Sequence, residues 1–407
     1  MQEQNRPTLF GYGLTTKAIA KKLGGGCIFF DDNAKESFKD EFGNTIYPSS
    51  QFDPQKSDLE ILTPSIKPNH PLLQKAKHPI SEYDYFLGDN AQKKPFNIWI
   101  SGTNGKTTTT QMVVHLLQKR GAISGGNIGT PLADMSMEAP IWVLESSSFT
   151  LHHTKSAAPN IYILLPITPD HLDWHGTKEA YEESKLSPLK NMREGELALI
   201  PKGLKVPKSD AFIIEYDSNE SLANTFGIDK AKIDFKGAFL QDALLALITT
   251  KVLYGELDYA LMNTFIKEAH RQQEIIDTKG RLWVNDSKAT NLDATIQAVK
   301  AYGDKELHLI LGGDDKGVAL DELFDVLKEY KIILYAIGSN EVKLMDLAKR
   351  YAIPAYALST LEKAVREITK HHTKDSIAML SPAAASLDQF SSYKERGDLF
   401  IKIVKEF

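Results

Sequence analysis

The sequence has a single cysteine, Cys27, no excess of basic residues and no long apolar run. One cysteine excludes an intramolecular disulfide and is typical of a reducing compartment, so Cys27 is expected to be a small buried residue. A formal net charge of -5 gives no sign of a nucleic-acid partner. No apolar stretch approaches the roughly 18 residues of a membrane helix, and the first residues, MQEQNRPT, contain no apolar signal core. These absences predict a soluble, cytoplasmic protein without membrane insertion.

Strand-like apolar runs alternate with helical patterns along most of the 407 residues. Such alternation is typical of α/β domains with mostly parallel sheets, and this length predicts more than one domain. We expect three domains, over residues 1–84, 85–268 and 269–407. The first and third are expected to be Rossmann-like and doubly wound, and the second to be a nucleotide-binding sheet flanked by helices. Residues 203–235 are charged and irregular, and no element is assigned to them.

Residues 96–110, FNIWISGTNGKTTTT, read as a buried strand, a turn rich in glycine and the start of a helix. Such a turn directs backbone N–H groups at one point, and the helix N-terminus adds attraction for anions. Lys106 would bring a charge to the β- and γ-phosphates of a nucleotide, and the Thr107 hydroxyl would contact its Mg²⁺. Ile100 replaces the first glycine of the full phosphate-loop pattern. The alternative is a simple strand-to-helix corner with a solvated lysine.

Three polar side chains lie at or soon after strand ends of the middle region, where parallel sheets bind ligands. Glu145 ends the strand IWVLE, His171 follows the strand IYILL, and Lys185 lies fourteen residues later on a helix. Taken singly, Glu145 could cap a helix, His171 could satisfy a backbone carbonyl and Lys185 could be solvated. Beside a phosphate loop, however, a carboxylate and an imidazole suit a divalent metal ion.

The N-terminal region has a glycine turn, GYGLTT, followed by a helix and by a strand that ends at Asp31 and Asp32. In nucleotide-binding βαβ units this arrangement places a diphosphate at the turn and a sugar hydroxyl at the acidic residue. A single G-x-G is also common in α/β corners without a ligand. The later stretch TPSIKPNHPLL, rich in proline, is expected to be an irregular surface loop.

In the last third of the chain, polar residues again gather after predicted strands. They are Asp286 to Asn291 in NDSKATN, Asp314 and Lys316 in GGDDKG, and Ser381 to Ser386. Packing does not explain this clustering, so we expect a second set of ligand contacts here. His371 and His372 read as a solvated helix end.

Together these motifs resemble the Mur ligases, the ATP-dependent amide ligases of peptidoglycan precursor synthesis. The resemblance rests on SGTNGKTT, GNIGTP, ESSSF, DHLDWH with Lys185, the pair His270–Arg271, NDSKATN, GGDDKG and LSPAAASLDQF. NDSKATN, SPAAASLDQF and TPSIKPNHPLL are similar to the members that add D-glutamate to UDP-N-acetylmuramoyl-L-alanine. This implies a cytoplasmic, monomeric ligase that uses ATP and two Mg²⁺ ions and forms an acyl-phosphate intermediate. The alternatives are a ligase for another amino acid, of the Mur or folylpolyglutamate type, and a non-catalytic nucleotide-binding module.

The resemblance also implies a role for individual residues. Catalysis would involve Lys106, Lys185, His171 and Lys288. ATP would contact Gly102, Thr103, Asn104, Gly105, Lys106, Thr107, Thr108, His270, Arg271, Asp286 and Lys288. Metal ions would be held by Thr107, Glu145, His171 and Lys185, the last as a carbamylated lysine. The UDP substrate would contact Leu14, Thr15, Thr16, Asp31, Asp32 and Asn127, and D-glutamate would contact Thr290, Lys316, Ser386, Leu387 and Tyr393.

One motif departs from the family pattern. The Mur ligases usually carry an H-N-x-x-N stretch that helps to hold adenine, whereas this chain has AFLQD, with Phe239 and Asp242 in place of the asparagines. Adenine is therefore expected to be held differently, and neither residue is assigned to the site.

Overall fold

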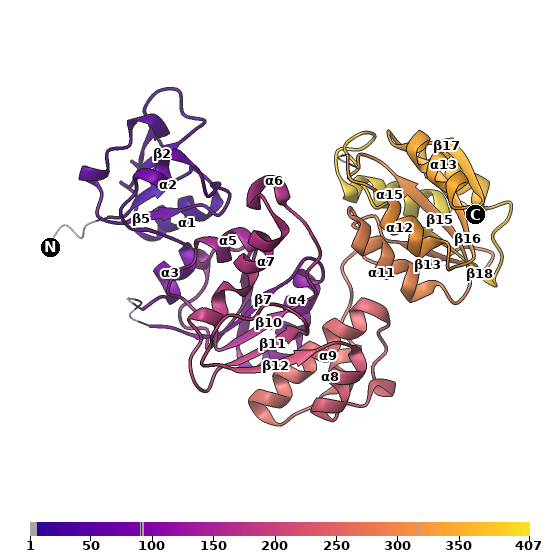
Figure 1. Ribbon diagram of the computed structural model, residues 1–407, viewed down its shortest axis with the longest axis horizontal. Helices are drawn as coiled ribbons and strands as arrows, with labels where there is room; N and C mark the ends of the chain where they lie inside the picture. Colours follow the sequence, from indigo (N-terminus) through magenta and orange to yellow (C-terminus); the bar gives the residue numbers. More distant parts are fainter. Residues whose placement is uncertain (1–5, 90, 92, 316) are drawn as a thin grey trace. The chain divides into compact units, whose positions relative to one another are not determined.

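The computed structural model describes residues 6–89, 91, 93–315 and 317–407. The chain divides into two compact units: unit 1 contains the residues up to Ile233 together with Asp242–Asn263, and unit 2 contains Asp234–Gln241 and Thr264–Phe407. Figure 1 labels the elements of both units. The described residues form three six-stranded sheets, two in unit 1 and one in unit 2, with mostly parallel pairing. The predicted α/β class is confirmed.

The first sheet of unit 1 has the strand order β3-β4-β2-β1-β5-β6. Its buried central strand, β1, pairs in parallel with β2 and β5, and Cys27 at the start of β2 is 1% exposed, as expected. The elements are β1 (Thr8–Phe10), α1 (Leu14–Lys22), β2 (Ile28–Asp31), β3 (Phe38–Lys39), β4 (Thr45–Pro48), β5 (Glu60–Leu62), α2 (Pro71–Lys75), β6 (Pro79–Ile80) and α3 (Glu82–Leu87).

The second sheet of unit 1 is entirely parallel, with the order β12-β11-β10-β7-β9-β8. Its inner strands are fully buried, which explains their continuous apolar runs. The strands are β7 (Phe96–Ser101), β8 (Ala122–Gly126), β9 (Ile141–Glu145), β10 (Ile161–Leu164), β11 (Leu197–Pro201) and β12 (Phe212–Tyr216). The helices are α4 (Lys106–Leu117), α5 (Ser148–His153), α6 (Leu172–His175), α7 (Lys178–Leu186), α8 (Asn219–Phe226), α9 (Gly237–Tyr254) and α10 (Tyr259–Asn263).

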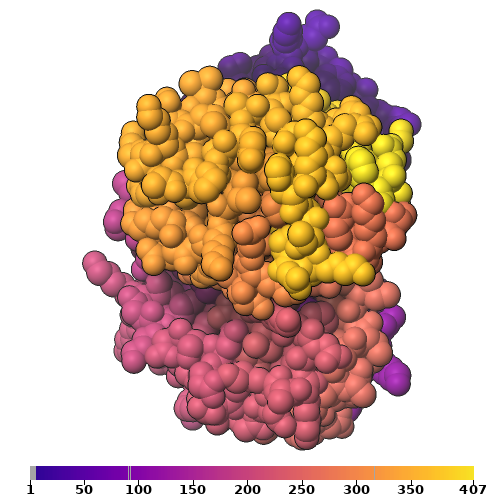
Figure 2. Space-filling model, turned by 90° about the vertical axis from the view of Figure 1, so that its right-hand side faces the viewer, coloured from indigo at the N-terminus to yellow at the C-terminus, as the bar shows by residue number. Residues whose placement is uncertain are grey.

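The sheet of unit 2 has the order β13-β14-β18-β15-β16-β17, and only β13 is antiparallel to its neighbour. Two apolar clusters fill this unit, one with side chains of α11, α12 and α13 and the other with side chains of α14 and α15. Figure 2 shows one face of this unit in orange and yellow. The elements are β13 (Gln273–Ile276), β14 (Leu282–Asn285), α11 (Leu292–Tyr302), β15 (Glu306–Gly312), α12 (Asp321–Leu327), β16 (Ile332–Ile337), α13 (Glu341–Arg350), β17 (Ala355–Ser359), α14 (Leu361–Ile368), β18 (Ser376–Leu380) and α15 (Tyr393–Val404).

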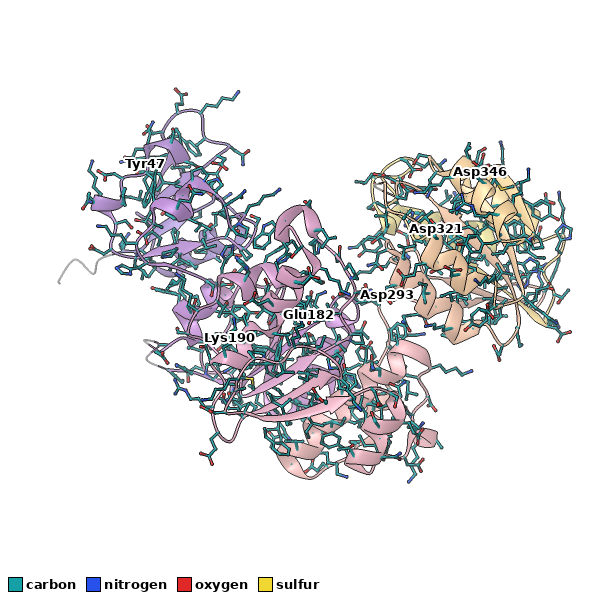
Figure 3. The ribbon with its side chains drawn as sticks, viewed as in Figure 1. Tyr47, Glu182, Lys190, Asp293, Asp321 and Asp346 are labelled. Atoms are coloured by element: carbon teal, nitrogen blue, oxygen red, sulfur yellow. The ribbon has the colours of Figure 1, made fainter. Side chains whose placement is uncertain are left out.

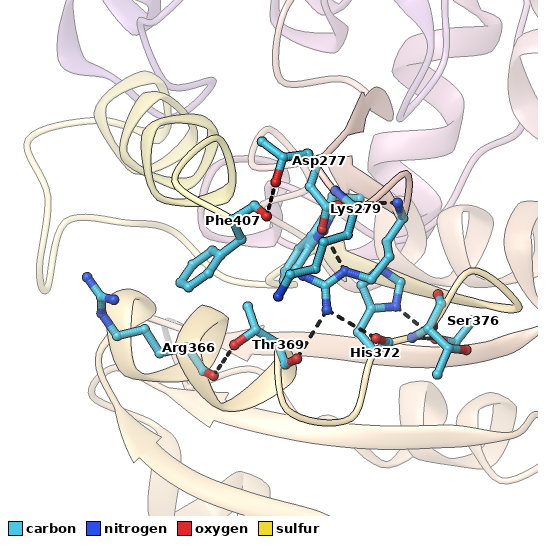
Figure 4. Close-up of polar contacts among 11 residues, drawn as sticks. Asp277, Lys279, Arg366, Thr369, His372, Ser376 and Phe407 are labelled. Carbon is cyan, nitrogen blue, oxygen red and sulfur yellow. Dashed lines mark hydrogen bonds and ion pairs between the residues drawn. The ribbon is translucent and has the colours of Figure 1, made fainter.

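Two local expectations were wrong. The proline-rich stretch is not wholly irregular, because α2 begins within it: Pro71 occupies the first helical turn, where its missing N–H costs nothing, and His70 caps the helix. His372 is not solvated but 4% exposed, and its Nδ1 lies 2.7 Å from the Ser376 hydroxyl (Figure 4). The region left unassigned contains β12 and α8.

By length and composition alone, α9 is long and apolar enough to cross a membrane, contrary to the expectation from the sequence. However, 56% of it is buried inside the protein, as in the core helix of a soluble domain. Its buried side chains include Leu244 and Leu247, both with no exposed surface.

Candidate active site

The topology of the second sheet brings three sequence motifs together. Strand β7 lies between β9 and β10 and is parallel to both. The carboxyl ends of these strands therefore share one edge of the sheet. Glu145 ends β9, the loop at 102–105 follows β7, and the segment that leads to His171 follows β10. The order of the strands thus places Glu145, the glycine-rich loop and the DHLDWH motif at the same edge.

The glycine-rich loop has a backbone that only glycine adopts readily. Gly105 has a φ of +83° directly before α4, and Gly102 has a φ of +142°, with Leu165 only 2.5 Å from the position of an added Cβ. The loop is tied to the next segment because Thr103 donates from its backbone N–H to the Pro166 carbonyl at 3.1 Å. The Lys106 ammonium donates to the carbonyl oxygens of Gly102 and Thr103, at 2.9 and 2.7 Å. The lysine therefore lies over the loop, as phosphate binding requires.

Lys185 is a buried amine and not the solvated lysine of the alternative interpretation. It lies on α7 and is 1% exposed, whereas Glu182 of the same helix, labelled in Figure 3, is half-buried. Its Nζ donates to the Gly102 carbonyl at 2.8 Å. Burial, and next the charge of Lys106, hold the pKa of Lys185 well below its usual value, against the opposing effects of Asp170 and Glu145. The buried site therefore shifts this amine toward its neutral form.

Glu145 is 3% exposed at the end of β9. Its Oε1 accepts a hydrogen bond from Asn127 Nδ2 at 2.6 Å, which fixes the orientation of the carboxylate. The other oxygen, Oε2, is buried and has no hydrogen-bond partner among the described residues. A buried acceptor without a donor is costly, so this oxygen is suited to a cation.

His171 is placed by a strained backbone, with a φ of +53° at the position before α6. Its ring packs against Phe149, with 4.8 Å between ring centroids, and its Nε2 lies 3.6 Å from an Asp170 carboxylate oxygen. Phe149 follows Glu145 by four residues, so the ring contact brings His171 toward the end of β9.

These residues fit a metal site only in part. Within residues 6–89, 91, 93–315 and 317–407, no group of three or more histidine, cysteine, aspartate or glutamate side chains could hold a metal ion. Glu145 and His171 supply two such groups, and the orphaned oxygen of Glu145 fits a cation. A complete set therefore needs further oxygen ligands, which the Thr107 hydroxyl and an anionic derivative of Lys185 would provide.

The glycine turn of the N-terminal sheet is held by Asp31. Its carboxylate accepts hydrogen bonds from the backbone N–H of Tyr12 at 2.7 Å and of Asn33 at 2.8 Å. The Thr16 hydroxyl donates to the Gly11 carbonyl at 2.6 Å and is buried. Asp32 is paired with His70 at 2.8 Å. Of the remaining predicted UDP contacts, Leu14 is 64% exposed and Thr15 is half-buried.

In unit 2, the predicted ATP contacts surround the end of β14. Asp286 accepts hydrogen bonds from the Gln272 backbone N–H at 3.1 Å and from the Ser381 hydroxyl at 2.8 Å, and burial raises its pKa to about 7. Glu268, which the sequence did not reveal, lies 3.2 Å from both Arg271 and Lys288 and holds the two cations together.

The predicted D-glutamate contacts lie around the same loop of unit 2. The Lys288 ammonium lies 5.4 Å from the centre of the Tyr393 ring, and the His270 ring lies 6.2 Å from it. Thr290 is exposed, Ser386 is 3% exposed and Leu387 is 69% exposed. Lys316 lies outside the described residues.

Arg396 is a second functional candidate that the sequence did not reveal. This guanidinium is 1% exposed and donates to the Ser287 hydroxyl at 3.0 Å, to the Ser287 carbonyl at 2.8 Å and to the Ala384 carbonyl at 3.1 Å. It therefore fastens the NDSKATN loop to the loop that carries Ser386. Nothing in the local sequence of α15 distinguishes it from a surface arginine.

A parallel sheet with a glycine-rich loop, a lysine and a hydroxyl at the start of a helix defines a nucleotide-binding α/β protein. The Mur ligase middle domain matches residues 100–244. A UDP-N-acetylmuramoylalanine--D-glutamate ligase of Campylobacter jejuni is 50% identical over 98% of this chain and 99% of its own length. A ligase of the same name from Helicobacter pylori is 46% identical over 97% of this chain and 98% of its own length. The chain belongs to the Mur ligase family, in the branch of these D-glutamate ligases.

Solved structures agree on the fold. MurF of Acinetobacter baumannii matches 97% of this chain and 90% of its own, with a TM-score of 0.59 at 14% identity. MurF of Thermotoga maritima, solved in complex with ADP, matches 99% of this chain and 97% of its own, with a TM-score of 0.58 at 14% identity. The three-sheet arrangement is therefore that of the Mur ligases.

Proposed function

We propose that this chain joins D-glutamate to UDP-N-acetylmuramoyl-L-alanine at the expense of ATP, in cytoplasmic synthesis of peptidoglycan precursors. The observation that carries the proposal is the near full-length identity of 50% to a D-glutamate ligase, with the phosphate loop and its lysine intact. A ligase for another amino acid has weaker support. The solved MurF structures are 14% identical to the chain, and at that identity they support the fold alone.

The reaction is the formation of an amide in two steps. The carboxylate of the acceptor attacks the γ-phosphoryl group of ATP, giving an acyl phosphate and ADP. The amine of D-glutamate then attacks the acyl carbon, and phosphate leaves. Phosphoryl transfer needs positioning and compensation of charge, which the loop at 102–108 and the Lys106 ammonium supply. Lys288 is proposed to add a second positive charge.

Magnesium binding is proposed for Thr107, Glu145, His171 and Lys185. A bound ion would cancel charge on the phosphates during transfer. The buried oxygen of Glu145 that has no partner among the described residues supports this assignment. A protonated Lys185 would repel the ion, whereas the neutral amine favoured by its low pKa reacts with CO₂ to give an anionic carbamate. Carbamylation of Lys185 would therefore replace a positive charge that repels the ion with an anionic ligand.

The substrate contacts are proposed for the remaining predicted residues. The UDP group would lie at the glycine turn with Leu14, Thr15, Thr16, Asp31 and Asp32, and the muramoyl part at Asn127. D-Glutamate would be held by Thr290, Lys316, Ser386, Leu387 and Tyr393, because its two carboxylates need cationic and hydroxyl partners. The protein is proposed to act as a monomer, over domains 1–84, 85–268 and 269–407.

The test is an assay of phosphate release with UDP-N-acetylmuramoyl-L-alanine, ATP and a panel of amines. We expect release with D-glutamate and little with L-glutamate, L-alanine or a diamino acid. Release that needs no amine would support a nucleotide switch instead. A preference for another amine, or for a folate acceptor, would assign the chain to a different ligase.

A further inference from the structure

A carboxylate lies beneath the phosphate loop in a place where packing alone would favour an apolar residue. Asp242 belongs to α9 and is 4% exposed. The residues that follow it in the helix, Ala243 to Ile248, have no exposed surface and are all apolar. Burying a carboxylate costs free energy unless hydrogen bonds compensate for it, so Asp242 calls for an explanation.

Asp242 contacts the loop and the helix that follows it. Its Oδ1 accepts a hydrogen bond from the Thr109 hydroxyl at 2.7 Å. The same oxygen lies 2.9 Å from the position of a Cβ added at Gly105. One carboxylate oxygen therefore touches the last glycine of the loop and holds the first turn of α4.

The Thr109 hydroxyl has two possible acceptors, and the choice between them defines the role of Asp242. The Thr109 hydroxyl lies 3.1 Å from the Gly105 carbonyl, which also accepts the Thr109 backbone N–H at 2.9 Å. A hydroxyl has one proton, and the carboxylate is the closer and stronger acceptor. Asp242 therefore fixes the Thr109 side chain and leaves the Gly105 carbonyl to the backbone of α4.

We propose that Asp242 is a positioning residue for nucleotide binding, which acts through Thr109 to hold Gly105 and the loop in the conformation that receives the phosphates. This inference rests on the proposed use of ATP by the same loop. Asp242 is also the first residue of α9 that is grouped with unit 1, since Gly237–Gln241 are grouped with unit 2.

The pair is tested with Thr109→Val, Asp242→Ala and the double variant. We expect each single variant to raise the Kd for a fluorescent ATP analogue and the KM for ATP about tenfold, because a buried hydrogen bond to a charged group is lost. The double variant should lose less affinity than the sum of the two single losses, since both single variants remove the same hydrogen bond. Thr109→Ser, which keeps the hydroxyl, should restore most of the affinity. The KM for D-glutamate should not change.

A matched control separates positioning from general loss of packing. Thr249 of α9 is fully buried and donates only within its helix, to the Leu245 carbonyl at 2.9 Å. Thr249→Val should leave the Kd for the analogue unchanged. Asp242→Asn keeps an acceptor of the same shape and replaces Asp242→Ala if that variant does not fold. Its loss of affinity for the analogue should be smaller than that of Thr109→Val.

Three results would overturn the proposal: additive losses in the double variant, an unaltered nucleotide Kd in Thr109→Val, or an equal rise in the KM for D-glutamate. Binding of the analogue is measured without the other substrates. A failure of the amine assay would therefore count against the proposed function and leave this test intact.

Discussion

Lys106 and Lys185 donate hydrogen bonds to the same acceptor, the carbonyl oxygen of Gly102, at 2.9 and 2.8 Å. Two ammonium groups on one oxygen repel each other, and the more deeply buried of them loses its proton more readily. This shared acceptor explains why the charge of Lys106 contributes to the low pKa of Lys185. The neutral amine is the form that reacts with an electrophile such as CO₂, as the proposed carbamylation of Lys185 requires.

Depletion of bicarbonate should therefore lower activity, and its return should restore it. Because burial holds the pKa of Lys185 well below its usual value, its amine should form the carbamate at a lower pH than an exposed lysine does. With ¹³C-labelled bicarbonate, NMR should show a carbamate signal that is lost in Lys185→Ala and kept in Lys190→Ala. Bicarbonate should not rescue Lys185→Ala, whereas a short carboxylic acid should do so in part. A carbamate signal that persists in Lys185→Ala would contradict the assignment.

Glu145→Gln should weaken the binding of magnesium and keep the local structure. Glutamine retains an oxygen for the hydrogen bond from Asn127 but loses the negative charge. We expect the Mg²⁺ concentration for half-maximal activity to rise about 10- to 100-fold. The measurement is phosphate release during a magnesium titration, with Glu179→Gln, at an exposed position of α7, as the control. An unchanged titration in Glu145→Gln would exclude this residue as a ligand.

Unit 2 should lose stability as the pH falls from about 6.5 toward 4. His372 is buried against Trp283 and His308, and burial lowers its pKa to about 4. The unfolded chain takes up a proton near pH 6.5 and the folded protein does not, so this stability is present above pH 6.5 and lost below it. Between pH 7 and 5 the free energy of unfolding should fall by about 2 kcal/mol from this group.

Urea unfolding of wild type and of His372→Gln at the two pH values measures that difference. The variant should show a smaller decrease between pH 7 and 5, whatever its stability at pH 7. The exposed neighbour gives the control, because His371→Gln should keep the dependence of the wild type. An identical decrease in His372→Gln would assign the acid sensitivity to other groups.

Arg396→Lys should loosen the two loops of unit 2 that carry predicted ligand-contacting residues, the NDSKATN loop and the loop with Ser386. A lysine ammonium cannot reach Ser287 and Ala384 with the fixed geometry of a guanidinium. We expect the free energy of unfolding to fall by about 2 kcal/mol and the KM for D-glutamate to rise about tenfold. Arg350→Lys, at a surface arginine that is paired with Asp321, is the control for both measurements. A KM that stays constant would reduce Arg396 to a purely structural role.

The sequence predicted the features that depend on neighbouring residues. The strand, the glycines and the helix around Lys106 are contiguous, so their pattern is visible without a fold. The ends of β9 and β10 were also visible, and the parallel order of the strands then brought Glu145 and the DHLDWH motif to one edge. The fold class followed from the same alternation of elements.

The features that the sequence did not reveal depend on distant contacts. Thr109 and Asp242 are separated by 133 positions, and their hydrogen bond exists only after α9 packs beneath the loop. The sequence around His372 is typical of an exposed helix end, and its burial depends on contact with Trp283 of β14. Residues 203–235 combine a short strand at the edge of the sheet with a capped helix, and few buried residues mark either one.

The position of Arg396 has a consequence for inhibition. Because the buried Arg396 of α15 binds both loops that are predicted to contact ligands, a small molecule that displaced this side chain would loosen both loops at once. If the loosened loops bound D-glutamate less tightly, D-glutamate would in turn weaken binding of the compound by the same factor.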